Sequence, residues 1–219
     1  VKELFNHLST IAFNQELKRK KVRVATRMTA MHSDQFLESE IFDPEQRAVT
    51  LSLARAGIPA SQTVYELLNW TLNPQQVRQD HIWAARITDK NERVTGTDLG
   101  AKKIGGDVKN TSVFIPDPMG ATGSTLVSAV SLYKKEFGGE GANYVALHLI
   151  VTPEFLNKVL VEHPETKIYA IRLDRGLSSP EVLKTVPGSQ WAQEKGLNEK
   201  QYIVPGAGGL GEILNNAFV

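Results

Sequence analysis

The sequence has 219 residues, of which 41% are apolar and 22% are charged, and this composition is typical of a globular chain with one substantial core. Its 25 Lys and Arg residues nearly balance 24 Asp and Glu residues, which excludes the broad basic surface of a duplex-binding protein. The absence of cysteine excludes disulfides and thiolate chemistry. No apolar run is long enough to cross a bilayer, and no secretory leader opens the sequence. We therefore expect a cytoplasmic protein without membrane or nucleic-acid partners.

The first half of the sequence mixes helical and strand patterns. Apolar residues recur at helical spacing near the start, so we expect a helical N-terminal segment over residues 1–45. A buried strand is predicted over 48–54, a helix over 61–68 with serine as its N-cap, and a short strand over 81–87. The polar stretch 88–110 has four glycines and no periodicity. We expect it to be an irregular, functional or mobile loop.

The second half alternates strands with helices. Strands are predicted over 112–115, 144–151 and 167–173, with one helix over 126–137 and another that Thr152 caps. This alternation predicts parallel strands joined by right-handed crossovers, and hence an α/β fold. We expect one domain over residues 1–219, in which an α/β core spans residues 46–174 and a C-terminal segment spans residues 175–219.

The loop over residues 119–125 consists mainly of Gly, Ala, Thr and Ser and directly precedes the predicted helix 126–137. Such a loop presents backbone N–H groups and hydroxyls at the positive end of the helix dipole, an arrangement that binds phosphate. Gly123 would let a phosphate approach the backbone closely. The sequence thus predicts a phosphate site, with an ordinary β–α connection as the alternative. No Lys-Ser/Thr pair follows the glycine, so the loop is not a Walker A motif.

Other candidate groups are less specific by themselves. The run 206–211 satisfies G-x-G-x-x-G, but too few residues follow it for a dinucleotide-binding unit. It is either a turn whose main-chain groups meet a flat polar ligand or a plain C-terminal turn. Arg55 and Arg86 could each bind phosphate or lie on a solvated surface. The five histidines lie far apart in the sequence, and we expect His148 to be a core residue rather than a metal ligand.

Three motifs together carry a family resemblance. They are Arg55–Gly57 after a strand, Asp117–Ser124, and the run Gly196–Gly206. In order and rough spacing, from about Ala48 onward, the chain resembles the uracil phosphoribosyltransferases of the type I phosphoribosyltransferase family, as a divergent member. The resemblance implies a mostly parallel sheet flanked by helices, with a hood formed by the N- and C-terminal segments.

The resemblance also implies an activity. Members transfer the phosphoribosyl group of PRPP to N1 of uracil, giving UMP and pyrophosphate in pyrimidine salvage. The expected partners are PRPP and uracil or a related base, with Mg²⁺ and with further copies of the chain in a homodimer or higher oligomer. The transition state resembles an oxocarbenium ion, so no residue is assigned as nucleophile or base.

Site residues follow by the same resemblance. Asp117 would lie beside the ribose hydroxyls, Arg55 and Arg86 would face the pyrophosphate, and the stretch 88–110 would be a flap that excludes water. The residues assigned to PRPP are Arg55, Arg86, Asp117, Met119, Gly120, Ala121, Thr122, Gly123, Ser124 and Thr125. The residues assigned to uracil are Tyr202, Ile203, Gly208, Gly209 and Leu210.

Three positions depart from the family pattern. Gly209 stands where the family carries an Asp that faces PRPP, so a carboxylate is expected to be missing. Residues 178–195 are inserted next to the expected base site, and Ser124-Thr125 replaces the usual Gly-Ser. These departures keep other functions open. The chain could be a non-catalytic PRPP- or nucleotide-binding homologue with a regulatory role, a nucleic-acid regulator that uses the basic run 18–21, or a flavodoxin-like binder.

Overall fold

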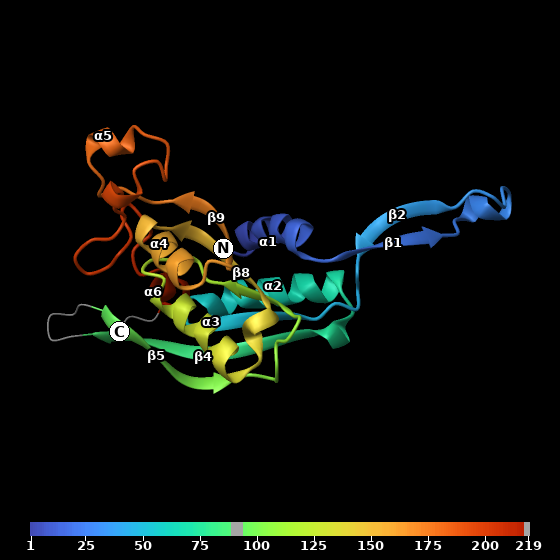
Figure 1. Ribbon diagram of the computed structural model, residues 1–219, viewed down its shortest axis with the longest axis horizontal. Coiled ribbons are helices and arrows are strands. Elements are labelled where there is room, and N and C mark those ends of the chain that lie inside the picture. Colours follow the sequence, from blue (N-terminus) through green and yellow to red (C-terminus); the bar gives the residue numbers. More distant parts are fainter. Residues whose placement is uncertain (89–93, 217–219) are drawn as a thin grey trace.

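The computed structural model describes residues 1–88 and 94–216 (Figure 1). The strands are β1 Arg19–Val24, β2 Leu37–Phe42, β3 Ala48–Ala54, β4 Val77–Thr88, β5 Val94–Lys103, β6 Ser112–Pro116, β7 Met119–Gly120, β8 Asn143–Val151 and β9 Lys167–Leu173. The helices are α1 Lys2–Glu16, α2 Gly57–Thr71, α3 Ser124–Glu136, α4 Pro153–Glu162, α5 Pro180–Leu183 and α6 Leu210–Asn215.

The main sheet has the strand order β5-β4-β3-β6-β8-β9, and the short β7 continues the pairing with β8 beyond the end of β6. Every pair in it is parallel except β4–β5. This confirms the predicted α/β fold with a mostly parallel sheet. In such a sheet the carboxyl ends of the parallel strands meet at one edge, which is where ligands bind.

Helices cover both faces of the sheet, as parallel sheets require. Along β8, Val145 and Leu147 pack with the buried side chains of α1 and α2, whereas Tyr144 and Ala146 pack with those of α3 and α4. Side chains therefore alternate between the two layers along a strand that is almost fully buried. This double burial explains why β8 is a nearly continuous apolar run in the sequence.

Several predicted elements are confirmed. The strands over 48–54 and 167–173 have the predicted bounds. The predicted helix 61–68 is the middle of α2, but Ser61 is not its N-cap, because the helix begins at Gly57 and the Ser61 hydroxyl donates to the main-chain oxygen of Ile58. The Oγ1 atom of Thr152 accepts a hydrogen bond from the N–H of Phe155 at 3.0 Å and so caps α4 as predicted. Local capping and apolar patterning are sufficient signals for these elements.

The expectation of a helical segment over residues 1–45 is correct only for α1. Residues 19–42 instead form the antiparallel pair β1–β2, which extends away from the rest of the chain (Figure 1). Opposite charges face each other across it, with Lys21 opposite Glu40 and Arg23 opposite Glu38, and such pairs stabilise a ribbon. The basic character of β1 conceals this pairing in the sequence.

The expectation of an irregular loop over residues 88–110 is wrong for residues 94–103. They form β5, an edge strand antiparallel to β4. Its glycines and its charged residues Asp98, Lys102 and Lys103 are typical of an exposed edge, where apolar alternation is weak. Residues 89–93 lie outside the described residues. The predicted flap therefore includes one arm of a β-hairpin.

A carboxylate attaches α1 to the sheet. Glu16 accepts hydrogen bonds from the Nζ of Lys167, from the hydroxyl of Tyr169 at 2.6 Å and from Asn143 at 3.3 Å. Burial raises the pKa of Glu16. The hydrogen bonds from these three side chains lower the pKa by a larger amount, so the net pKa lies below the ordinary value for glutamate. The ionised form of Glu16 is thus favoured by folding.

We expect Glu16→Gln to make unfolding less sensitive to acid. A carboxyl group with a lowered pKa in the folded state contributes stability above its unfolded pKa, and this contribution is lost as the pH falls through the folded pKa. Urea unfolding should show a loss of about 1 kcal/mol at pH 7 and a smaller loss at pH 3. Glu3→Gln, on the same helix, is the control. An equal loss at both pH values would contradict this role for Glu16.

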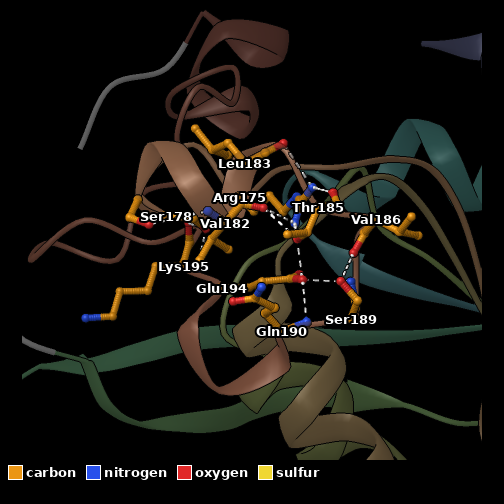
Figure 2. A network of polar contacts seen from close by, with 12 residues as sticks. Arg175, Ser178, Val182, Leu183, Thr185, Val186, Ser189, Gln190, Glu194 and Lys195 are labelled. Carbon is orange, nitrogen blue, oxygen red and sulfur yellow. Dashed lines mark hydrogen bonds and ion pairs between the residues drawn. The ribbon is translucent and has the colours of Figure 1, made fainter.

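Residues 175–195 fold around a buried ion pair (Figure 2). The guanidinium of Arg175 donates to Glu194 Oε1 at 3.2 Å and to the main-chain oxygens of Val182, Leu183 and Thr185. The same Glu194 oxygen accepts the N–H of Gly188 at 2.8 Å. Both charged side chains are buried, and the hydrogen bonds to Glu194 Oε1 offset part of their desolvation, while Glu194 Oε2 has no partner among the described residues. The inserted residues 178–195 are therefore held together by the Arg175–Glu194 ion pair and its hydrogen bonds.

Candidate functional site

A cavity of about 880 Å³ opens at the carboxyl edge of the sheet. It is bounded by the end of β3, by β7 and the start of α3, by β8, and by the C-terminal turn that leads into α6. No lining residue comes from the described insertion 178–195. The cavity thus brings together three segments that are far apart in the sequence: the end of β3, the loop before α3 and the C-terminal turn.

Most of the predicted site residues meet in this cavity. Eight of the ten residues assigned to PRPP line it: Arg55, Asp117, Met119, Gly120, Ala121, Thr122, Gly123 and Thr125. All five residues assigned to uracil line it as well: Tyr202, Ile203, Gly208, Gly209 and Leu210. Ser124 lies next to the lining as the first residue of α3. The side chain of Arg86 is outside the described part, although its backbone belongs to β4.

The loop before α3 has the geometry of an anion cradle. Gly123 is the N-cap of this 13-residue helix and has a φ of 79°, a conformation that favours glycine. A Cβ atom there would lie 3.2 Å from the main-chain oxygen of Phe155. The hydroxyl of Thr122 lies 3.3 Å from both the N–H and the hydroxyl of Ser124. Donor groups and hydroxyls therefore gather at the positive end of the helix dipole.

A lysine that the sequence analysis missed stands beside this loop. The Nζ atom of Lys158, on α4, donates to the Oγ of Ser124 at 2.8 Å. An ammonium at this place adds positive charge to the N-terminus of α3. Only the packing of α4 against α3 brings Lys158 here, so no local sequence pattern could have identified it.

Two carboxylates, one buried and one partly buried, hold the C-terminal turn in position. Asp174, at the end of β9, accepts the N–H of Gly206 at 2.8 Å and is bound by the guanidinium of Arg172. Glu154, in the first turn of α4, accepts the N–H groups of Gly196 and Leu197 at 3.0 and 3.1 Å. The turn that lines the cavity is thus anchored to the sheet on one side and to α4 on the other.

The carboxylate of another residue lies beside position 209, where the family's Asp is absent from this sequence. A Cβ atom built on Gly209 would overlap the Oε2 atom of Glu212. Both residues line the cavity. The carboxylate of Glu212 therefore occupies the space into which a side chain at position 209 would project. The negative charge is present, supplied from the first turn of α6.

Two further lining residues, His148 and Gln201, were not predicted as site residues. His148 is buried, as expected of a core residue, but the residue also lines the cavity. Gln201 has a φ of 60°, a left-handed conformation that is uncommon for residues other than glycine. Neither position carries a recognisable motif, and only the folded arrangement shows that these side chains reach the site.

Within residues 1–88 and 94–216, no cluster of three or more His, Asp or Glu side chains has the arrangement of a metal site. None of the helices in that part of the chain combines the length and apolarity that are needed to cross a membrane.

Comparison with known proteins gives the family. The family model described as uracil phosphoribosyltransferase matches residues 1–190. The uracil phosphoribosyltransferase of Thermosipho melanesiensis is 32% identical over 176 residues, which cover 79% of this chain and 67% of that protein. The uracil phosphoribosyltransferase of Acinetobacter baylyi is 35% identical over 112 residues, covering 51% of this chain and 42% of that protein. The match thus spans less than half of the Acinetobacter protein.

Among solved structures, the AQ2163 protein from Aquifex aeolicus superposes with a TM-score of 0.70. It is 20% identical in sequence, and the alignment covers 100% of this chain and 85% of that one. This likeness shows a shared fold. With the family model matched over most of its length, the chain belongs to the uracil phosphoribosyltransferase family.

Proposed function

We propose that the protein transfers the phosphoribosyl group of PRPP to N1 of uracil, or of a closely related base, and releases pyrophosphate. The observation that carries this proposal is the single cavity that the anion cradle before α3 shares with the C-terminal turn. PRPP needs an anion site at one end and a base next to its C1 atom at the other. A cavity of about 880 Å³ is large enough for both substrates.

Each wall of the cavity has a task in this proposal. The loop over 121–125 binds the 5′-phosphate, Asp117 accepts hydrogen bonds from the ribose hydroxyls, and Arg55 faces the pyrophosphate. Departure of pyrophosphate leaves positive charge at the ribose C1, as in glycoside chemistry. Catalysis then depends on positioning and charge stabilisation, without a covalent intermediate. The cavity's carboxylates suit such a transition state.

The donor set also suits magnesium that arrives with PRPP. Mg²⁺ in such sites is usually held by substrate phosphates and by one or two carboxylates. The cavity offers the carboxylates of Asp117 and Glu212. The ion would neutralise the leaving pyrophosphate. The residues of this chain would orient the two substrates around it.

Uracil recognition is assigned to main-chain groups of the C-terminal turn. Ile203 is buried and Gly208 adopts a φ of 62°, so the turn presents its peptide groups rather than bulky side chains. A flat base with alternating donors and acceptors can pair with such groups. The glycines at 208 and 209 keep the approach open.

We also propose that the protein forms a homodimer or a higher oligomer. Large apolar side chains are exposed on and around the β1–β2 hairpin: Val24, Met28, Met31, Phe36, Leu37 and Ile41. A patch of this kind on a projecting ribbon favours association.

The proposed reaction is tested by incubating the protein with labelled uracil, PRPP and Mg²⁺. We expect labelled UMP and pyrophosphate in equal amounts. A panel of other bases in the same assay defines the specificity. The competing function is a PRPP or nucleotide binder without turnover, which is expected if the Glu212 carboxylate does not replace the Asp that the family carries at position 209. Tight binding of both substrates without product would establish that function and refute the transferase.

Arg55 provides a test of the pyrophosphate end. We expect Arg55→Ala to raise KM for PRPP by about 10- to 100-fold, because a hydrogen-bonded charge is worth about 1.5–3 kcal/mol. KM for uracil should change by less than about threefold. Steady-state kinetics with each substrate varied in turn measures both, with Arg27→Ala on the distant hairpin as the control. An unchanged KM for PRPP would contradict the role of Arg55.

A further inference from the structure

The imidazole of His148 is held in one tautomer. Its Nδ1 atom lies 2.6 Å from the main-chain oxygen of Asp117. A carbonyl oxygen can only accept a hydrogen bond, so Nδ1 carries the hydrogen. A neutral imidazole carries one ring hydrogen, so Nε2 has none and presents a lone pair as an acceptor.

This acceptor has no protein partner. Nε2 of His148 is buried and makes no hydrogen bond with any described residue, and the residue as a whole is 2% exposed. The ring packs edge-on against Phe155, with 4.6 Å between ring centroids. Buried polar atoms are nearly always paired, and leaving one unpaired reduces stability. Because His148 lines the ligand cavity, this unpaired acceptor points to a donor that arrives with the ligand.

We propose that Nε2 of His148 accepts a hydrogen bond from a donor group of the bound substrate, either a ribose hydroxyl or a base N–H. The inference rests on the proposed function, since it takes the substrate to be PRPP and a nucleobase. The hydrogen bond between the ring and Asp117 places His148 beside the residue assigned to the ribose, which favours the hydroxyl as the donor. His148 would then help to select and orient the substrate without exchanging a proton with it.

Two substitutions separate the two ring nitrogens. In His148→Asn, the side-chain amide can still donate to the Asp117 oxygen, but no acceptor remains where Nε2 was. In His148→Gln, the longer amide can place an oxygen close to the Nε2 position. Calorimetric titration of the full chain with ribose 5-phosphate and, separately, with uracil shows which ligand the acceptor serves.

We expect His148→Asn to weaken one of these two ligands by about tenfold, a typical effect of one lost hydrogen bond, with the other ligand unchanged. His148→Gln should recover most of that loss. Weaker ribose 5-phosphate identifies a hydroxyl donor, and weaker uracil identifies a base N–H. If the wild type binds both ligands and both variants bind them equally well, the role of His148 is refuted. If the wild type binds neither, the proposed function fails with it.

A measurement on the unmodified protein guards against variants that fail to fold. In protein labelled with ¹⁵N-histidine, Nε2 of His148 should give the resonance of an unprotonated ring nitrogen. We expect that resonance to move when the ligand identified by calorimetry is added, because a donor then engages the lone pair. A resonance that stays in place at saturating ligand would overturn the inference.

Discussion

Gly123→Ala is expected to lower kcat/KM for PRPP by about 100-fold while the protein remains folded. Alanine at a φ of 79° costs about 1–2 kcal/mol, and its Cβ would press against the main-chain oxygen of Phe155. The loop must move to relieve both. Because a displacement of about 1 Å in a positioning group can cost about 100-fold in rate, the effect on activity should exceed the effect on stability.

Gly138→Ala is the matched control for this prediction. Gly138 also has a positive φ, of 64°, but nothing lies within 4 Å of the Cβ that alanine would add. It precedes a short turn at the opposite end of α3 from the cavity-lining loop. Both variants should therefore lose stability in urea through backbone strain, Gly123→Ala the more because of its added contact, and only Gly123→Ala should lose activity. Equal activity in the two variants would show that the loop has no role in substrate binding.

Gly209→Asp is expected to reduce activity rather than to restore it, although Asp is the usual residue of the family at this position. The new side chain would displace the Glu212 carboxylate, whose oxygen occupies its space, and would set two negative charges side by side. Two carboxylates in contact repel each other, and this repulsion would disturb the arrangement of the site. We expect a loss of about tenfold in kcat/KM.

A carboxylate exchange makes this test decisive. Glu212→Gln should lower kcat/KM by about 10- to 100-fold, because the cavity loses a charge. Adding Gly209→Asp to Glu212→Gln should recover part of that loss, since the carboxylate returns to the same space from position 209. Kinetics of the two single variants and the double variant measure the coupling. Higher activity in Gly209→Asp alone would refute the assignment of Glu212.

Much of the sheet and its central connection was predictable from the sequence. Strands β3, β8 and β9 are apolar or β-branched runs between clear breaks, and α4 has a Thr-Pro start. The loop before α3 was recognisable because its glycine and hydroxyl residues serve the local backbone and the ligand together. Such features depend on residues that are close in sequence.

The parts that could not be predicted depend on contacts between distant residues. The β1–β2 hairpin and the edge strand β5 are polar, so their pairing leaves little apolar signal. Glu212 is an exception, because it is only three residues from Gly209 and the first turn of α6 brings its carboxylate back to that position. His148 and Lys158 reach the site through the packing of β8 and α4. Their roles follow from geometry that no local motif encodes.

The central claim is that the bend preceding α3 holds the terminal phosphate of the sugar, and a crystal structure of the protein soaked with UMP tests it most directly. We expect the phosphate to sit against the N–H groups and hydroxyls of residues 121–125, with the base against the turn at 208–210. UMP bound elsewhere, with this bend empty, would contradict the account.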